Sequence, residues 1–418
     1  MSCTKIRKEL YLKSEIPGAE KCLSSFYTGK GIERTEGYSH MSRSDISDYK
    51  HYTRASDDNG KTWTCWRESA NNFVETDEYI YDMHEICRVY NPVAGHMVQM
   101  RLRRLYIKET PSSRRELVVN GKKNFFDHVF CEISNDQGKN WGNSVKLEYE
   151  KVPAEAKEKP LIPDNLVINA MMGTVNTRTV VTPSGKIIHP VMIFPRKLGV
   201  PKHDSSSIYG VVYSILVIIG EWDKNAEKYI WFYSKPLYVS PKISKRGVFE
   251  PFMARLSDGR LMLDMRGSNT EKTPGRRWYS ISNDEGVTWS EITDLRYDTG
   301  EQFYSPSSMN QIIRSIKTGK LYWVGNITNQ PPEGNSPRYP LVIAQVKEKD
   351  IYKISLIKDS VTIIDTKLKD DSDDLQLSNF KIIENRETLN FELYVTRFLS
   401  KGRKDWTSDV FKYSIIPG

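Results

Sequence analysis

Apolar runs of strand length occur in pairs along this chain, and a short polar turn, in most cases with a glycine, separates the two runs of each pair. The clearest pair is EPFMARL and LMLDMRG around SDGR, from Glu250 to Gly267. Short apolar runs bounded by turn residues are typical of strands, and two of them around a tight turn predict an antiparallel hairpin. Helical periodicity is nearly absent. Five more segments predict hairpins, the first of them less regularly; they span residues 22–54, 84–107, 174–194, 308–328 and 377–398.

An eight-residue motif, Ser-x-Asp-x-Gly-x-(Thr/Asn)-Trp, occurs three times. It reads SDDNGKTW at 56–63, SNDQGKNW at 134–141 and SNDEGVTW at 282–289. The Asp can bond nearby amides, the Gly supplies a backbone angle that side chains resist, and the hydroxyl can bond within the loop. The Trp can tuck under the turn as an apolar plug. Each copy is therefore interpreted as a structural turn between strands, and its recurrence at blade-like spacing predicts a repeat architecture.

These elements predict an all-β fold, a single six-bladed β-propeller of four-stranded antiparallel blades that spans residues 1–418. Six units in 418 residues give about 70 residues each, which leaves room for loops. The N-terminal ~20 residues are expected to form an extension or a closing strand. Propeller blades leave only short, protected sheet edges, and the ends of their inner strands converge on one face.

Composition excludes several classes of protein. The longest apolar stretch, VVYSILVIIG at 211–220, suits a buried strand and is too short to span a membrane. The net charge of +8 is spread along the chain, so we expect no nucleic-acid partner. No metal or other cofactor is expected, because the acidic run at 369–374 does not match a calcium loop and the five cysteines have no metal-ligand spacing; these are Cys3, Cys22, Cys65, Cys87 and Cys131.

The N-terminus leaves the location open. MSCTK resembles the end of a bacterial lipoprotein signal, so Cys3 would be an exported protein's lipid anchor if the gene begins upstream. Otherwise we expect a cytoplasmic protein. We expect a monomer, with a dimer as the alternative.

Hairpin register pairs carboxylates with arginines. Positions equidistant from a turn lie opposite each other, which places Glu250 opposite Arg266 or Gly267. The same arithmetic predicts two further pairings, at the equivalent end of two other blades: Glu85 with Arg101 and Arg103, and Asp374 with Arg397. Each pair is either a structural ion pair lining the channel or part of a site.

The three motifs, together with EPFMARLSDGRLMLDMRGSN and GRRWYSISNDEGVTW, resemble the sialidase superfamily, whose motif is called the Asp-box. The resemblance covers about residues 40 to 345. In that family a Glu opens this hairpin and activates a tyrosine nucleophile, while an Arg closes it and is one of three that hold the substrate carboxylate. The resemblance therefore implies that Glu250 is the activating carboxylate and that Arg266 binds substrate. It implies the same binding role for Arg338 in NITNQPPEGNSPRYPLVIAQV.

The family's acid/base Asp lies about ten residues before the first Asp-box. Asp45 fits that offset, with Asp48 as the second choice and Arg43 beside it. Two family features are not found: residues 14–18 read SEIPG without the first Arg, and LQLSNFKII has no Tyr where the nucleophile is expected. The candidates to replace that nucleophile are Tyr304, Tyr339 and Tyr394.

The resulting hypothesis is a sialidase-like exo-glycoside hydrolase that removes a terminal, acidic or neutral, sugar from a glycan or polysaccharide. Asp45 would protonate the leaving oxygen, and Glu250 would act as base or nucleophile. Arg266 would lower the pKa of Glu250, and with Arg338 it could bind an acidic sugar in forked geometry. Two alternatives stay open. A polysaccharide lyase would use His84, beside Glu85 and opposite Arg103, and a non-catalytic carbohydrate-binding propeller would tolerate Glu250→Gln.

Overall fold

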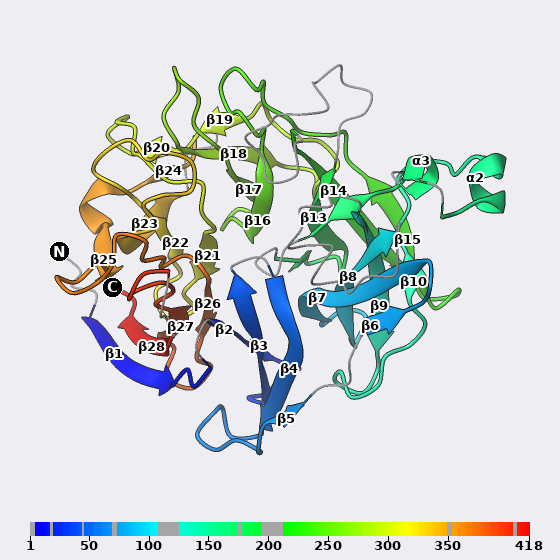
Figure 1. The fold of residues 1–418 in the computed structure, drawn as a ribbon, viewed down its shortest axis with the longest axis horizontal. Coiled ribbons are helices and arrows are strands. Elements are labelled where there is room, and N and C mark those ends of the chain that lie inside the picture. Colours follow the sequence, from blue (N-terminus) through cyan, green and yellow to red (C-terminus); the bar gives the residue numbers. More distant parts are fainter. Residues whose placement is uncertain are drawn as a thin grey trace.

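The computed structural model describes eleven stretches of the chain: residues 5–16, 20–43, 46–68, 73–107, 125–161, 163–166, 168–173, 178–193, 212–348, 353–403 and 408–418. These residues form six small sheets arranged in a ring (Figure 1). All strand pairs in the sheets are antiparallel except β20 with β24. The predicted six-bladed β-propeller, with blades mostly of four strands, is confirmed.

The blades follow one another along the chain. Blade 1 contains β2 (Glu20–Tyr27), β3 (Arg34–Arg43), β4 (Ile46–Ser56) and β5 (Arg67–Glu68). Blade 2 contains β6 (Phe73–Glu75), β7 (Tyr79–Asn91), β8 (His96–Ile107), β9 (Phe125–Ser134) and β10 (Val145–Lys146). Blade 3 contains β11 (Met171–Met172), β12 (Val180–Val181), β13 (Ile187–Ile193), β14 (Ser214–Asp223) and β15 (Lys228–Tyr233).

Blade 4 contains β16 (Phe249–Arg255), β17 (Leu261–Arg266), β18 (Arg277–Ser282) and β19 (Thr293–Asp294). Blade 5 contains β20 (Arg296–Tyr297), β21 (Gln311–Arg314), β22 (Leu321–Asn326), β23 (Leu341–Lys347), β24 (Ser355–Leu356) and β25 (Thr362–Asp365). Blade 6 contains β26 (Phe380–Glu384), β27 (Phe391–Thr396), β28 (Val410–Ile416) and β1 (Lys5–Leu12). The described residues also form the helices α2 (Ala154–Glu158) and α3 (Pro163–Leu166) and the 3₁₀ turn Lys358–Ser360.

The N-terminal strand belongs to the last blade. β1 pairs with β28 from Lys5 opposite Ile416 to Leu12 opposite Val410, so the two ends of the described chain lie side by side (Figure 1). The ring is therefore joined by main-chain hydrogen bonds between its first and last strands. Among the described residues, no helix combines the length and the apolar character needed to cross a membrane.

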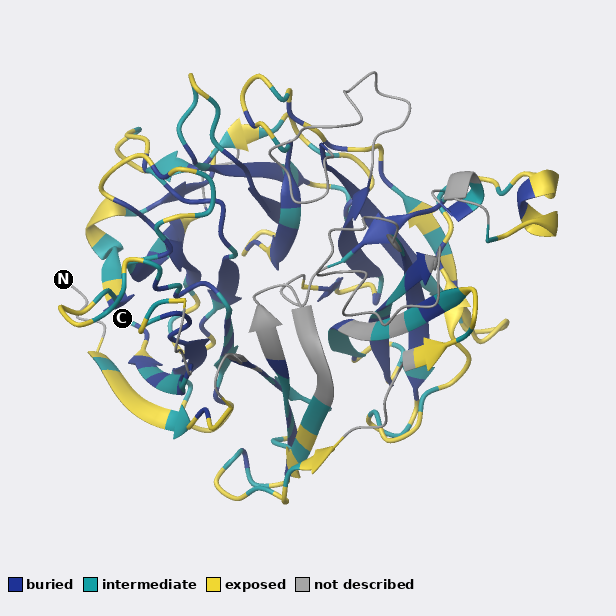
Figure 2. Ribbon diagram, in the orientation of Figure 1, coloured by how far each residue is buried: buried dark blue, intermediate teal, exposed yellow. Residues whose placement is uncertain are grey.

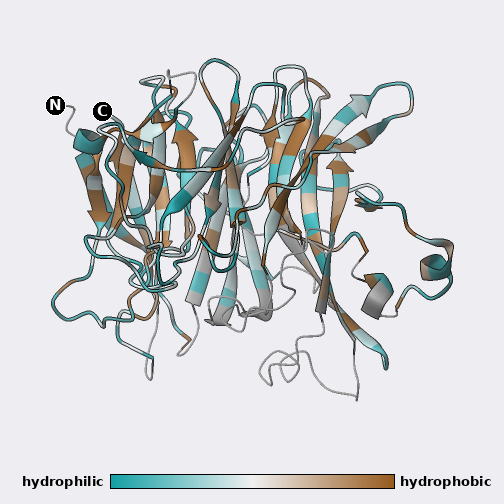
Figure 3. Ribbon diagram, turned by 90° about the horizontal axis from the view of Figure 1, so that it is seen from above, coloured by the Kyte–Doolittle hydropathy of each residue, from teal (hydrophilic) through white to brown (hydrophobic). Residues whose placement is uncertain are grey.

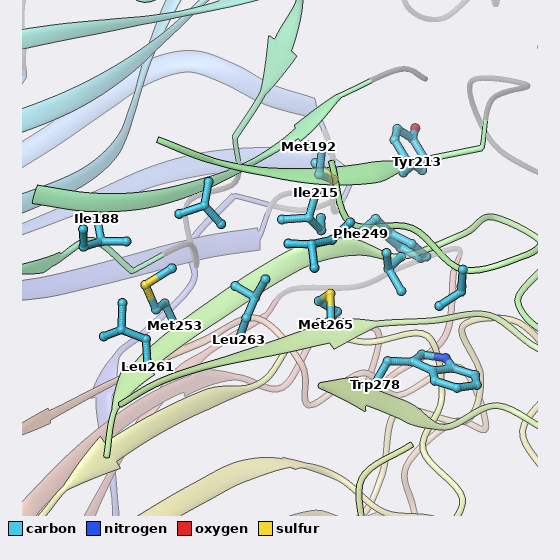
Figure 4. Close-up of a cluster of buried hydrophobic side chains, with 14 of the residues drawn as sticks. Ile188, Met192, Tyr213, Ile215, Phe249, Met253, Leu261, Leu263, Met265 and Trp278 are labelled. Atoms are coloured by element: carbon cyan, nitrogen blue, oxygen red, sulfur yellow. The ribbon is translucent and has the colours of Figure 1, made fainter. Parts of the chain in front are cut away.

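Apolar side chains fill the spaces between neighbouring sheets. The buried residues lie along the strands, and exposed residues lie at the loops and outer edges (Figure 2). Hydrophobic residues are likewise concentrated on the strands, and many of the loops are hydrophilic (Figure 3). Figure 4 shows the layer between blades 3 and 4, where Met192, Ile215 and Phe249 come together. Phe249 is 1% exposed, so the residue before Glu250 is fixed in this core. A strand end held by a close-packed core is a rigid place for a functional side chain.

The three repeat turns, Ser56–Trp63, Ser134–Trp141 and Ser282–Trp289, connect the third and fourth main strands of blades 1, 2 and 4. In each turn the Ser hydroxyl accepts a hydrogen bond of 2.8 Å from the glycine N–H, as Ser282 does from Gly286. The Asp carboxylate accepts one from the amide four residues further along the chain, at 2.9 Å for Asp284 and Thr288. The residue before each glycine also has positive φ: Asn59, Gln137 and Glu285, at 63°, 62° and 56°. The hydrogen bonds and backbone angles expected from the motif are thus present.

Candidate active site

Glu250 lies at an irregular point of an inner strand. Phe249 pairs with Arg266, but the next pair is Phe252 with Asp264, so β16 contains a bulge at Glu250. Glu250 has φ 46°, in the left-handed region that residues other than glycine seldom adopt. Its N–H points at Met192 Sδ, 3.1 Å away. Bulges and such backbone outliers occur preferentially next to functional sites, where they re-aim a side chain.

Arg266 at the end of β17 holds the Glu250 carboxylate. One Nη donates to Glu250, and the other donates to the Ser307 carbonyl and to Asn335 Oδ1, the latter at 3.1 Å. Arg266 Nε donates to Ser307 Oγ at 3.2 Å. The Glu250 side chain is 18% exposed and the Arg266 side chain 6%. The Glu250 carboxylate is therefore the more accessible partner of the pair, while Ser307 and Asn335 hold the Arg266 guanidinium in place.

Two more arginines act on Glu250. Arg338, between β22 and β23, donates to Gln376 Oε1 at 2.8 Å and to Ser378 Oγ at 3.0 Å. Arg246, in the loop before β16, places its guanidinium carbon 4.2 Å from the centre of the Phe249 ring. The Nε of Arg246 is buried and has no hydrogen-bond partner within the part of the chain that the structure describes.

The charges of these arginines decide the ionisation of Glu250. Burial raises its pKa, but the charges of Arg266, Arg246 and Arg338 and the hydrogen bond from Arg266 outweigh that effect and hold the pKa of Glu250 below its usual value. Burial, with the like charges of Arg338 and Arg246, lowers the pKa of Arg266 to about 9, so this guanidinium stays protonated at neutral pH. Three guanidinium groups thus act on one ionised carboxylate, and the excess of positive charge favours an anionic ligand.

A buried polar network of Asp264, Arg277 and Trp323 holds the segment that binds Arg266. Arg277 Nε donates to Asp264 Oδ1 at 2.9 Å, and Trp323 Nε1 donates to Asp264 Oδ2 at 3.1 Å. Arg277 also donates to the Ser308 carbonyl at 2.8 Å. This bond fixes the segment that contains Ser307, so Asp264 and Arg277 position the partner of Arg266.

Of the candidate acid residues, Asp48 belongs to β4 of blade 1. Asp45 lies outside the described residues, and the side chains of Arg43 and Asp48 are also outside the description. The backbone of Arg43 pairs with Ile46 at the tip of the β3–β4 hairpin, whereas Arg34 at the other end of β3 pairs with Ser56 of the repeat turn. In blade 4, Glu250 likewise lies at the end away from the repeat turn. The hairpin tip and Glu250 are therefore at the same end of their blades.

In blade 2, one of the predicted strand pairings is present and another is wrong. Glu85 lies opposite Arg101, as expected, but His84 lies opposite Leu102 rather than Arg103, which faces Met83. A bulge between Glu85 and Cys87 shifts the register by one residue. The side chains of His84 and Glu85 are outside the description, and the Arg103 guanidinium carbon lies 4.1 Å from the centre of the Phe130 ring.

In blade 6 the predicted pair of Asp374 with Arg397 is wrong. Arg397 contacts Asp365 and Asp371 instead, and Asp374 pairs with Arg403 at 2.9 Å. The hairpin arithmetic does not apply, because the chain before β26 forms a turn in which the Leu375 N–H bonds the Ser372 carbonyl. Arg397 therefore fixes the loop that precedes the two ligands of Arg338.

The tyrosine candidates separate clearly. Tyr304 is half-buried and lies three residues before Ser307 in the chain. Its carbonyl accepts a hydrogen bond from the Thr328 N–H at 3.0 Å. Tyr339 is half-buried and follows Arg338 directly. Tyr394 is buried, its hydroxyl donates to Glu392 at 2.8 Å, and burial raises its pKa far above the usual range, so it is not suited to be a nucleophile.

Sequence reasoning missed several residues of this cluster: Arg246, Ser307, Asn335, Gln376 and Ser378. All lie in loops between strands, so hairpin register gives no signal for them. For Arg246 the only signal is its place four residues before Glu250. Among the described residues, no group of three or more His, Cys, Asp or Glu side chains could hold a metal ion, and Cys65, Cys87 and Cys131 are free thiols.

Comparison with known proteins supports the fold. No protein-family model and no curated protein sequence matches this chain. A protein of unknown function from Dyadobacter fermentans is similar in structure, with a TM-score of 0.60 and 14% identity over 98% of both chains. The NanB sialidase from Streptococcus pneumoniae has a TM-score of 0.59 and 13% identity, covering 97% of this chain and 69% of that one. The GH93 α-L-arabinofuranosidase of Fusarium graminearum has a TM-score of 0.51 and 11% identity, covering 97% and 98%. At these identities the likeness shows a fold shared with propeller glycosidases.

Proposed function

We propose that this protein is an exo-acting glycoside hydrolase that removes a terminal acidic sugar from a glycan or polysaccharide. The observation that carries the proposal is the ionised Glu250, paired with Arg266 and acted on by Arg246 and Arg338. A carboxylate held ionised suits a base or a nucleophile, and guanidinium groups bind a carboxylate through paired N–H donors. The likeness to solved glycosidases supports the fold-level part of the proposal.

The reaction requires two carboxyl groups. Asp45, with Asp48 as the second choice, would donate a proton to the glycosidic oxygen as the bond to the anomeric carbon breaks. Glu250 would then either attack that carbon, with water later releasing the sugar, or remove a proton from the attacking water. Arg266 and Arg338 would bind the sugar carboxylate, and Arg43 beside Asp45 would contact the same substrate.

The segment where the resemblance implies a tyrosine contributes other groups here. Gln376 and Ser378 bind Arg338 in that place. A carboxylate nucleophile faces repulsion from an acidic sugar, and the guanidinium groups around Glu250 reduce that repulsion. Tyr304 and Tyr339, both half-buried near the cluster, are proposed as substrate contacts.

Other proposed roles fall to residues farther from Glu250. Glu85 and Arg103 would bind parts of the glycan beyond the terminal sugar, and His84 would join them. Arg397 is buried and paired with Asp365 and Asp371, so it would act only by fixing the loop next to Arg338. The strand register weakens the lyase alternative, because His84 lies opposite Leu102 and not opposite Arg103. A binding propeller without catalysis is the second candidate, since the engaged pair of Glu250 and Arg266 would also serve a lectin.

The test is hydrolysis of an aryl-glycoside panel by the wild type and Glu250→Gln in parallel. The panel spans α-sialosides, uronides, and neutral α- and β-glycosides. Glu348→Gln is a matched control, because Glu348 also pairs with an arginine, Arg314, at 2.7 Å, but bonds the Ser257 N–H at the other end of blade 4. The proposal predicts release of one acidic sugar that only Glu250→Gln abolishes. Release by neither the wild type nor the control would favour the lectin or the lyase alternative. Release by Glu250→Gln at the wild-type rate would show that Glu250 is not part of the chemistry.

A further inference from the structure

Within the described part of the chain, the fourth residue of the repeat turn forms hydrogen bonds with the preceding blade in two of the three turns. Glu285 of blade 4 accepts hydrogen bonds from Ser184 Oγ at 2.9 Å and Lys186 Nζ at 3.1 Å, both near the first hairpin turn of blade 3. Asn59 of blade 1 donates to Asn385 Oδ1 at 2.9 Å and to Glu387 at 3.2 Å, in the corresponding turn of blade 6. In these two places the turn fastens one blade to the next.

The equivalent residue of blade 2, Gln137, lines a cavity instead. The cavity has a volume of about 280 Å³ and lies between blades 1 and 2, which are neighbours in Figure 1. Its lining contains Phe26, Thr28, Thr35 and Thr53 from blade 1 and Arg88, Met97, Gln137 and Gly138 from blade 2. We call this space the seam cavity.

The glycines of the second and third repeat turns differ in how closely the preceding blade approaches them. A Cβ built on Gly286 would lie 3.1 Å from Ile188 and 3.6 Å from Val217, both in blade 3. A Cβ built on Gly138 would meet, among the described residues, only its own turn's Trp141, at 3.4 Å. The second repeat turn therefore stands away from blade 1, while the third lies against its neighbour.

The lining of the seam cavity mixes hydrogen-bonding groups with apolar surface. The Thr35 and Thr53 hydroxyls and the Gln137 amide offer both donors and acceptors, and the Thr28 hydroxyl, which donates to the Glu33 carbonyl, offers an acceptor. Arg88 is anchored by its Nε bond to Gln99 at 2.8 Å, and its guanidinium carbon lies 5.3 Å from the Phe26 ring centre. Several neutral polar groups beside an aromatic ring match the alternating hydroxyls and C–H surface of a sugar ring. The cavity contains a single guanidinium group, that of Arg88, which is less positive charge than a phosphate site usually has.

We propose that the seam cavity binds one sugar residue of a glycan, as a second site separate from Glu250. Thr35 pairs with Ala55 next to the first repeat turn, so the cavity lies at the repeat-turn end of the blades, away from the Glu250 end. This site would hold a glycan on the protein without taking part in bond cleavage. The proposal does not depend on the reaction assigned to Glu250.

The experiment measures binding of single sugars by ligand-observed NMR. The probes are the methyl glycosides of glucose, galactose, mannose, xylose and arabinose, together with glucuronate. The proteins are the wild type, Glu250→Gln, the double variant Thr35→Val/Thr53→Val, and the control Thr293→Val on an exposed strand position of blade 4. Valine keeps the β-branched shape that suits a strand and replaces the hydroxyl by a methyl group, which cannot form hydrogen bonds. Thermal unfolding of each variant shows that it is folded.

We expect at least one methyl glycoside to bind the wild type, Glu250→Gln and Thr293→Val equally, and Thr35→Val/Thr53→Val about tenfold more weakly, because two hydrogen bonds are lost. Equal binding by the double variant, or no binding of any probe, overturns the proposal. Binding lost only in Glu250→Gln also overturns it, and assigns the sugar to the candidate active site instead. Failure here and failure of the hydrolysis test are therefore distinguishable.

Discussion

Arg266 joins Glu250 to Ser307. One Nη of Arg266 donates to the Glu250 carboxylate, while its Nε and other Nη donate to the hydroxyl and the carbonyl of Ser307. The Arg266 guanidinium is thus held by both Glu250 and Ser307, which restricts its orientation. Because Glu250 itself lies on a bulge with positive φ, both partners are held by backbone features rather than by the ion pair alone. Such preorganisation is what an electrostatic site requires.

Replacing Arg266 by lysine should lower kcat/KM on the order of a hundredfold, because lysine cannot bond Glu250 and Ser307 together in a planar fork. The charge is kept, so the loss would come from geometry. Steady-state kinetics on the substrate found with the aryl-glycoside panel measures it. Arg314→Lys is the matched control at the Arg314–Glu348 pair and should leave kcat/KM near that of the wild type.

Arg246 should determine preference for an acidic sugar. The positive charge of its guanidinium acts on Glu250 and would equally attract the carboxylate of an incoming sugar. Arg246→Met is expected to raise KM for the acidic substrate about tenfold while kcat changes little. The exposed Lys242→Met tests whether loss of any nearby positive charge has the same effect. An unchanged KM for Arg246→Met would contradict this role.

The depressed pKa of Glu250 makes stability depend on pH in a definite direction. The folded-state pKa lies below the ordinary value of 4.5, so the unfolded chain takes up the proton first as the pH falls. The stabilisation is complete well above pH 4.5 and is lost as the pH falls through the folded-state value. Urea unfolding across this range should show a smaller acid-induced loss for Glu250→Gln than for the wild type. The acid limb of kcat/KM should also lie below pH 4.5.

The contact between blades 6 and 1 should be important for stability. Arg34 pairs with Glu392 at 2.9 Å and donates to the Tyr394 hydroxyl at 3.0 Å, and all three side chains are buried. Glu392→Gln should lower the free energy of unfolding by about 3–5 kcal/mol, because it leaves the Arg34 charge buried without its counter-ion. The exposed pair of Lys61 and Glu387 joins the same blades, and Glu387→Gln should cost about 1 kcal/mol or less. Equal effects in urea unfolding would refute the distinction.

The fold could be predicted because its signals are local. The SDGR turn sets the register that brings Glu250 beside Arg266, and each repeat motif contains the groups that close its own turn. The site could be predicted only where it lies on such hairpins. Arg246, Ser307 and Gln376 reach it from loops whose course depends on packing between blades, and no spacing in the sequence encodes that course. The predicted pairing of Asp374 with Arg397 was wrong for the same reason, because the chain forms a turn where a strand was expected.

The most direct test of the central claim is kcat/KM of Glu250→Gln relative to the wild type, on the acidic aryl glycoside that the wild type cleaves, with Glu348→Gln measured alongside. If Glu250 is the base or nucleophile, its variant should lose on the order of 10²- to 10⁴-fold while Glu348→Gln keeps the wild-type rate. If both variants cleave at the wild-type rate, Glu250 is not part of the chemistry, and the arginine cluster around it is a binding or structural feature.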